Sequence, residues 1–418
     1  MLTPEVQAQL MAYYTGMARK NGTVFQIGAT FAISPSVQQK IVEDMQNLTD
    51  LSRKINFRLV SQRTAQVISF GVNRGITTRN DQSLKERAFN KAWIYTTMKQ
   101  RFNWVIPWEN IDAWAGTGDL KKILPKHYLQ AALEEALFIG LNGLERHADP
   151  SSFYDENDPG AQLKRVDRGW SVVLGERLPG NVVTEWVPGT GVIIFGKVRT
   201  LPLSGIEATS EEGGTKTGIP FPGHGMVNGG MVSFRDQSGY VDQDYQVDTT
   251  STEDKVIINK PFATTTFGAS AVMIQRPDFA NIGELIVVGK RQVPDGKRQG
   301  LEAWIGDDIL AAYEQKIYAS ENPATPSEHQ YMARTLNNYG GLPGYHVADF
   351  PDSEIWISNP KLVFGIYELK GSRRREAKED QTAEGFADRT YVEKDNVVED
   401  PERFVCYKNL RMLEEYVE

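Results

Sequence analysis

The chain has very little cysteine or histidine chemistry available to it. Its 418 residues include one cysteine, Cys406, so no intrachain disulfide can form and a reducing compartment is expected. The same count excludes a zinc knuckle built from paired cysteines. None of the histidines stands in the His-Glu-x-x-His spacing of a zinc protease. They are His127, His147, His224, His329 and His346. The sequence predicts no metal, no cofactor and no catalytic residue.

Long apolar runs and an excess of positive charge are also missing. No stretch approaches the roughly 18 apolar residues that a membrane span needs, and the N-terminus lacks the basic and apolar regions of a signal peptide. We therefore expect a protein that stays in a cytoplasm and has no membrane partner. The formal net charge of -8 argues against a protein that reads a nucleic-acid sequence, because such proteins usually carry a basic face. It does not exclude a container whose inner wall faces DNA.

Four short patterns could carry chemistry, and each has a simpler structural explanation. Gly116-Thr117-Gly118-Asp119 lacks the Lys-Ser/Thr ending of a phosphate loop, so a turn before a helix is favoured. His224 stands between two glycines and could bind a ligand, but a flexible loop is favoured. Cys406 lies in the apolar segment Phe404–Tyr407, which indicates a buried thiol. Three tryptophans fit core or interface anchors better than a nucleic-acid stacking platform: Trp104, Trp108 and Trp114.

The run Arg373, Arg374 and Arg375 leaves three alternatives open. Acidic and basic residues follow it at 376–380, so a solvated turn of mixed charge is favoured. Salt bridges between subunits are the second alternative. Contact with DNA phosphates is the third.

The first 106 residues predict an arm and then a loop. Thr3-Pro4-Glu5 and Ser34-Pro35 are helix starts, each followed by apolar residues at helical spacing. Two helices this short cannot close a core of their own, so residues 1–55 are predicted to be an arm. A polar stretch at 73–91 predicts a protruding loop between strand candidates. These candidates are Phe57–Val60, Gln66–Val72, Trp93–Met98 and Phe102–Ile106.

The middle of the chain predicts a long helix and a β-rich module. The helix is expected from Lys126 to His147, with Pro125 near its start and a length of about 33 Å. Residues 181–275 are rich in glycine and have no sustained helical period, which predicts a separate module inserted into a host domain. Its strand candidates are Val192–Phe195, Met231–Phe234, Lys255–Ile258 and Ala271–Ile274.

After this module the pattern returns to mixed helices and strands. A helix is predicted at Asp307–Ile317. The predicted strands are Leu285–Val288, Glu354–Ile357, Leu362–Tyr367 and Phe404–Tyr407.

Taken in order, several short segments resemble the P2-like family of phage major capsid proteins. Each is short, and their shared order along most of the chain carries the resemblance. The segments are Ser34-Pro35-Ser36-Val37-Gln38, Asp50-Leu51-Ser52-Arg53-Lys54-Ile55-Asn56, Ile111-Asp112-Ala113-Trp114-Ala115, Gly140-Leu141-Asn142-Gly143, Arg168-Gly169-Trp170, Gly340-Gly341-Leu342-Pro343 and Ser372-Arg373-Arg374.

The resemblance implies an α+β protein with the HK97-like capsid fold. It also implies an extended loop that lies across a neighbouring subunit. The β-rich module is larger than anything that the family pattern places there, which suggests an inserted domain. The implied divisions are an N-arm at 1–55, the extended loop at 56–106, a peripheral domain with a spine helix at 107–180, the inserted β-rich domain at 181–278, an axial domain at 279–350 and return strands at 351–418.

The implied function is that of a major capsid protein that is not an enzyme. Copies of the chain would assemble into hexamers and pentamers of an icosahedral head around double-stranded DNA, in the host cytoplasm. The expected partners are other copies, a portal, a separate scaffolding protein and DNA packaged without sequence preference. The residues expected at subunit contacts are basic: Arg74, Arg79, Lys85, Arg87, Arg373, Arg374 and Arg375.

Three other functions remain as alternatives. A β-rich tail or baseplate protein would explain the inserted module, but not the long helix followed by mixed α/β structure. An encapsulin-like nanocompartment would share the fold and differ in its contents. A hydrolase with a lectin-like insert is disfavoured because the sequence offers no catalytic set.

Overall fold

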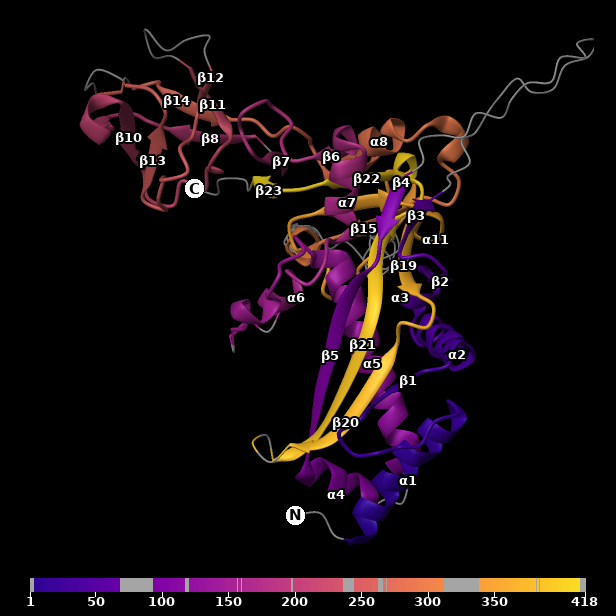
Figure 1. The fold of residues 1–418 in the computed structure, drawn as a ribbon. Coiled ribbons are helices and arrows are strands. Elements are labelled where there is room, and N and C mark those ends of the chain that lie inside the picture. Colours follow the sequence, from indigo (N-terminus) through magenta and orange to yellow (C-terminus); the bar gives the residue numbers. More distant parts are fainter. Residues whose placement is uncertain are drawn as a thin grey trace, which may run out of the picture. The chain divides into compact units, whose positions relative to one another are not determined.

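The computed structural model forms two compact units (Figure 1). Unit 1 comprises Met1–Leu178 and Asn359–Pro401, and unit 2 comprises Pro179–Ser358 and Glu402–Glu418. Each unit is therefore assembled from segments far apart in the sequence. The residues that the structure describes are 4–67, 93–116, 120–155, 157–158, 160–196, 198–235, 244–261, 266–267, 269–311, 338–380, 382 and 384–413.

Unit 1 is built on a six-stranded sheet centred on one long strand. In spatial order its strands are β1 (Thr30–Ala32), β20 (Arg374–Asp380), β21 (Gly385–Val398), β19 (Phe364–Leu369) and β2 (Asn56–Val60), with β5 (Met98–Pro107) also paired to β21. β21 pairs with β5 over residues 385–394 and with β19 over residues 394–398. The pairing of β2 with β19 is parallel, and the other pairings are antiparallel. A separate hairpin pairs β3 (Thr64–Val67) with β4 (Trp93–Thr96).

Helices cover one face of this sheet (Figure 1). They include α1 (Pro4–Lys20), α2 (Pro35–Gln46), α4 (Trp108–Gly116) and α5 (Leu120–Asn142). Unit 1 also contains α3 (Asp50–Arg53), α6 (Gly160–Leu163), α7 (Trp170–Arg177) and α11 (Pro360–Val363). Leu10 and Tyr14 of α1 are buried in one core cluster with Ile106, Leu124 and Phe386. The two N-terminal helices are present as predicted. The first of them is buried against the sheet because it cannot bury its apolar face alone.

Helix α5 begins and ends earlier than predicted. It starts at Leu120, so Pro125 lies inside it, and it ends at Asn142. The turn before Pro125 is helical because it places Leu124 in the core, where 1% of its surface is exposed. Beyond Asn142 the chain turns away, and Leu144 N donates to Lys164 O. Leu144, which lies within the predicted helix, is 53% exposed.

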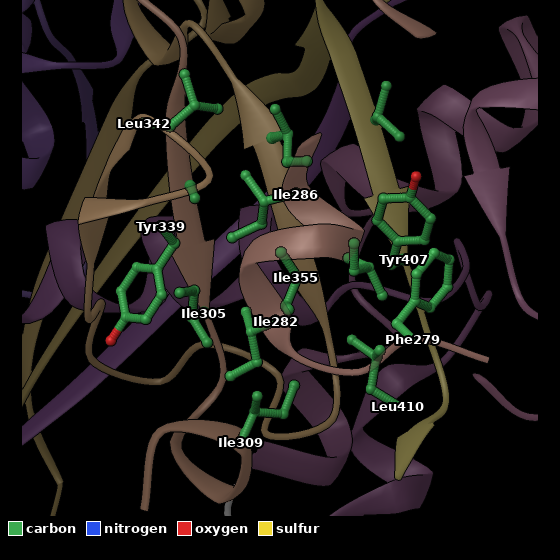
Figure 2. Packing of buried hydrophobic residues seen from close by; sticks show 14 of the residues in the cluster. Phe279, Ile282, Ile286, Ile305, Ile309, Tyr339, Leu342, Ile355, Tyr407 and Leu410 are labelled. Carbon is green, nitrogen blue, oxygen red and sulfur yellow. The ribbon is translucent and has the colours of Figure 1, made fainter. Parts of the chain in front are cut away.

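Unit 2 contains a second six-stranded sheet that packs against helix α8 (Ile282–Gln292). The strands of this sheet are β16 (Asn338–Tyr339), β17 (Leu342–Tyr345), β15 (Glu302–Ile305), β18 (Ile355–Ser358), β22 (Phe404–Tyr407) and β6 (Val182–Val183). Figure 2 shows Ile282 and Ile286 of α8 among the side chains of Ile305, Ile355 and Tyr407. A two-stranded sheet of β7 (Ile193–Gly196) and β23 (Leu410–Leu413) joins the same core through Leu410.

One predicted strand of this unit was wrong. Leu285–Val288 lies inside α8, because Asn281 caps the helix by accepting from Glu284 N at 2.9 Å. Ile282, Leu285 and Ile286 are buried at helical spacing. In the predicted helix at Asp307–Ile317, residues 307–311 are helical and the rest lie outside the described residues.

The glycine-rich module forms strands, as predicted. Two small sheets have the orders β13-β10-β9 and β12-β11-β14-β8. A separate cluster of apolar residues from both sheets, including Val232, Ile258 and Met273, forms its core. The strands are β8 (Arg199–Pro202), β9 (Thr209–Glu211), β10 (Lys216–Pro220), β11 (Met231–Arg235), β12 (Asp244–Gln246), β13 (Lys255–Ile258) and β14 (Val272–Gln275).

The chain enters and leaves this module at adjacent points. Ile194 N donates to the Asp278 carboxylate at 2.7 Å, and Gly196 N donates to Phe279 O at 3.0 Å. Ile193, Phe195 and Phe279 all belong to the core of the second sheet. The separately packed part therefore begins after Gly196 and ends before Asp278.

Most other strand predictions are confirmed within two residues. β2, β18 and β22 lie where strands were predicted, and β19 starts at Phe364 because α11 occupies the residues just before it. β5 contains the predicted strand Phe102–Ile106 but starts four residues earlier, at Met98. Of the strand predicted at Gln66–Val72, only residues up to Val67 are described. No helix in the described ranges is both long enough and apolar enough to span a membrane.

Candidate assembly surface

The arginine run enters strand β20, and its members face opposite sides of the sheet. Arg373 and Arg375 are 2% and 5% exposed, whereas Arg374 is exposed. Side chains alternate along a strand, so residues two apart share a face. Arg373 and Arg375 point toward the helices, and Arg374 points to the open side.

Arg373 is neutralised by Glu368 of the neighbouring strand β19. Its Nε and Nη2 atoms donate to the two carboxylate oxygens at 2.9 and 2.8 Å. Gln38 of α2 donates to the same carboxylate at 2.7 Å, and Tyr128 of α5 lies 3.3 Å from Arg373 Nη1. Burial alone would raise the pKa of Glu368, but the Arg373 guanidinium holds it below its usual value.

Arg375 is neutralised by Asp388 of β21. Its Nε atom donates to both oxygens of Asp388, at 2.7 and 2.9 Å, and Tyr14 of α1 donates to the same carboxylate at 2.7 Å. The guanidinium also lies over the Tyr128 ring, 4.3 Å from its centroid. Burial alone would lower the pKa of Arg375, but Asp388 keeps it well above its usual value. These contacts join α1, α5 and the sheet.

The favoured interpretation of the run as a solvated turn was therefore wrong for two of its three members. Arg373 and Arg375 form buried pairs inside unit 1, and sequence reasoning missed both acidic partners. Arg374 alone has a side chain available to a neighbouring molecule. The other residues expected at contacts lie outside the described residues: Arg74, Arg79, Lys85 and Arg87.

A third buried ionic cluster holds the base of the β3–β4 hairpin. Arg146 donates to Asp167 and to Asp395, in each case at 2.5 Å. The Asp395 carboxylate accepts from Thr96 N at 2.8 Å, and Asp167 accepts from Gln100 at 3.1 Å. Burial and the neighbouring Asp167 carboxylate raise the pKa of Asp395 to about 6. The cluster thus ties β4 and β5 to β21 and to the segments that follow α5.

The sheet face that carries Arg374 is polar and open. Strand register places Arg374 opposite Tyr391 of β21, and Tyr391 opposite Arg101 of β5. Arg101 lies over the Tyr391 ring, 5.5 Å from its centroid. A cleft of about 1060 Å³ borders this row, and its lining includes Lys99 and Lys370 as further cations.

Other sequence candidates have structural roles in the described parts. Cys406 is fully buried, as predicted, and burial raises its thiol pKa well above the usual value. His224 is in a loop, as predicted, but its ring is 4% exposed and accepts from Met226 N at 2.9 Å. The tryptophans at 104, 108 and 114 pack against the core of unit 1. Within the described ranges no group of three His, Cys, Asp or Glu residues could hold a metal ion.

Residues 9–201 and 246–410 match the sequence pattern of the family described as Phage major capsid protein, P2 family. The chain belongs to this family. The gap in the match, 202–245, falls inside the β-rich module.

Individual family members are similar over shorter stretches. The major capsid protein of Serratia phage KSP20 is 28% identical over 133 residues, which are 30% of this chain and 37% of that protein. The capsid proteins of Escherichia phage P2 are 24% identical over 191 residues, which are 43% of this chain and 51% of that relative. The chain therefore matches between about a third and a half of the length of these curated relatives.

A solved structure of the satellite phage P4 procapsid including the size determination (Sid) protein shares the fold. The similarity covers 98% of this chain and 99% of that chain, with a TM-score of 0.62 and 17% sequence identity. The P2-family chain described here therefore has the α+β HK97-like capsid fold, as expected from its sequence.

Proposed function

We propose that this chain is the shell subunit of a phage head and assembles with copies of itself into hexamers and pentamers of an icosahedral capsid around double-stranded DNA. The observation that carries the proposal is the family match, which extends through both units of the fold. The virion shell is its place of action, with assembly in the host cytoplasm and no catalytic step.

The fold also offers the kinds of contact that a shell needs. Specific protein interfaces of ordinary size bury about 1,200–2,000 Å², and a shell subunit makes several of them. Many individually modest contacts give a stable lattice through multivalency while each remains reversible. Arg374 remains our proposed contact residue from the arginine run, together with Arg74, Arg79, Lys85 and Arg87.

Further partners belong to the same proposal. A portal and a separate scaffolding protein would act during assembly, and DNA would be enclosed without sequence recognition. We also propose that residues 198–275 are an insertion in the host fold, because they form a core of their own between adjacent points of entry and exit.

Electron microscopy of the purified protein tests this function. We expect round shells, formed by the chain alone or with a scaffolding protein from the same phage. Tubes or fibres with a receptor-binding head would instead indicate a tail protein. Shells recovered with an enzyme cargo and no DNA would indicate a nanocompartment.

A further inference from the structure

One sheet face of unit 1 carries a cluster of exposed basic side chains, although the chain has a net negative charge. Lys99 and Arg101 of β5, Lys370 of the β19–β20 turn and Arg374 of β20 all line the 1060 Å³ cleft, and all four side chains are exposed. No carboxylate among the described residues forms an ion pair with any of them. The cleft therefore offers charge to a partner.

The strand beside the cleft also offers backbone groups. Within the described part of the chain, β5 pairs only with β21, so its other edge is open over ten residues. An open edge presents N–H and C=O groups that an extended polypeptide can use. Carboxylates at Glu135, Asp149 and Glu393 also line the cleft. DNA carries a negative charge at every phosphate and would meet these acids along its whole length. A polypeptide can place a few carboxylates beside the cations and pair its neutral backbone with the open edge, so the lining favours a polypeptide over DNA.

The same unit carries a loop of complementary charge. Tyr154 is 59% exposed, and Asp155 and Asp158 beside it are exposed. The Asp158 carboxylate pairs with Lys164 at 3.6 Å on the surface and accepts from Gly160 N at 3.1 Å. The Asp155 carboxylate accepts hydrogen bonds from Asn157 alone in the described ranges. Figure 1 shows this loop and α6 projecting away from the sheet of unit 1. An exposed aromatic residue beside carboxylates is a suitable anchor for a cationic cleft.

We propose that the cleft at Arg101 and Arg374 binds the acidic loop at Tyr154–Asp155 of a second copy of this chain. The proposal rests on the shell function proposed above. Ser151 and Gln162, on either side of the loop, line the cleft, but Tyr154 and Asp155 do not. Cleft and loop therefore share no contact residue, so the contact is heterologous and generates a ring when its rotation closes. Such a contact would contribute to the hexamers and pentamers of the shell.

Charge reversal with rescue tests the contact. Arg101→Glu with Arg374→Glu, and separately Asp155→Lys, should lower the assembled fraction about tenfold at low salt, measured by sedimentation. Combining the reversals should restore assembly. Lys40→Glu, at an exposed position of α2, is the matched control and should leave assembly unchanged. Circular dichroism checks that each variant is folded.

A disulfide test reads the contact directly. Asn103 lines the cleft and Asn157 lies in the loop, and both are exposed. Because the native Cys406 is buried, only introduced thiols should react. Asn103→Cys together with Asn157→Cys should give a ladder of reducible multimers under oxidation, and either change alone should not.

The outcomes separate the two proposals. Wild-type protein that forms no shells contradicts the proposed function. Shells that form equally well with both arginines reversed, without a ladder from the cysteine pair, overturn the docking contact alone. Reversal that leaves assembly intact but weakens binding of duplex DNA, measured by fluorescence anisotropy, would assign the cleft to phosphate and also overturn it.

Discussion

Charged side chains in the core of unit 1 are held as matched pairs. Arg375 with Asp388 and Arg373 with Glu368 are each at most 6% exposed in their side chains. Taking such charges out of water is costly, and the cost is offset only while both partners and their hydrogen bonds are present. The stability of unit 1 should therefore depend on each partner.

Asp388→Asn is predicted to destabilise unit 1 strongly. It leaves the Arg375 guanidinium buried without a counter-charge, which typically costs about 3–5 kcal/mol. Urea unfolding followed by circular dichroism measures the loss. Asp50→Asn is the control, because the Arg53–Asp50 pair is on the surface and its acidic side chain is 98% exposed. Equal stability of the two variants would contradict the prediction.

Asp395 is predicted to give the stability a measurable pH dependence. Burial and Asp167 raise its folded-state pKa to about 6, from roughly 3.9 when unfolded. Its contribution to the free energy of unfolding is therefore fully present below about pH 4 and is lost as the pH rises through about 6. Between pH 7.5 and 5, the wild type should gain stability relative to Asp395→Asn. If the free energy of unfolding changed with pH equally in the wild type and in Asp395→Asn, the pKa of Asp395 would be ordinary and the prediction would be wrong.

The sequence could not show which arginines of the run 373–375 point into the core and which point to solvent. Residues 376–380 carry charges of both signs, and this pattern correctly predicted that one face of β20 is exposed. The partners of the buried members lie on other strands, and Asp388 is thirteen residues from Arg375. Finding them requires the register of β20 against β21, where Ala377 lies opposite Asp388. The available signal was Ala377, the one uncharged residue of 373–380, which shares the buried face with Arg373 and Arg375.

At the scale of elements, two short segments that resemble the capsid family are in contact with each other. They are Gly140-Leu141-Asn142-Gly143 and Arg168-Gly169-Trp170. Gly169 N donates to Gly143 O at 2.9 Å, and the Trp170 ring lies against Gly140. A Cβ atom at Gly140 would lie 2.6 to 2.8 Å from three ring atoms of Trp170. The end of α5 and the start of α7 are therefore packed through glycine, and neither motif alone reveals that they meet.

Gly140→Ala is predicted to destabilise unit 1 by about 1–3 kcal/mol, because the methyl group overpacks a fully buried tryptophan. Gly16→Ala is the matched control in helix α1, where nothing lies within 4 Å of the new methyl group. The control should stabilise the protein by about 0.5–1 kcal/mol, because glycine has more freedom to lose in a helix. Thermal unfolding measures the Tm of each variant relative to the wild type. Tm changes of the same sign in the two variants would contradict the packing argument.

Elements were predictable where local pattern decides them. Alternation or apolar runs located most strands, including Phe404–Tyr407 at its full length. The errors came where tertiary packing overrides a local signal. Pro125 was taken for a helix start, although Leu124 before it is buried in the core. The apolar run in α8 is too short to distinguish a buried strand from a helix without its cap.

At the scale of the whole molecule, the β-rich module is separable by its packing. Its core cluster contains none of the residues of the cluster that α8 joins. The chain enters near Ile194 and leaves near Asp278, and these two points are hydrogen bonded. Glycine content and the lack of a helical period located the module only approximately, at 181–275. β7 lies within that range but pairs with β23 in the host core.

Replacing residues 198–275 with a short Gly-Ser linker should leave the core of unit 2 folded. A short linker closes at small entropic cost because the two ends are adjacent. Trp304 and Trp356 report on this core, since both are fully buried and their ring centroids are 6.3 Å apart. The excised segment contains no tryptophan, so near-ultraviolet dichroism and fluorescence of the two proteins can be compared directly. We expect a native-like spectrum and, if the module is an insertion in the lattice subunit, shells by electron microscopy. A collapsed tryptophan signal would show that the module supports the host core, whereas a native signal without shells would place the module among the assembly contacts.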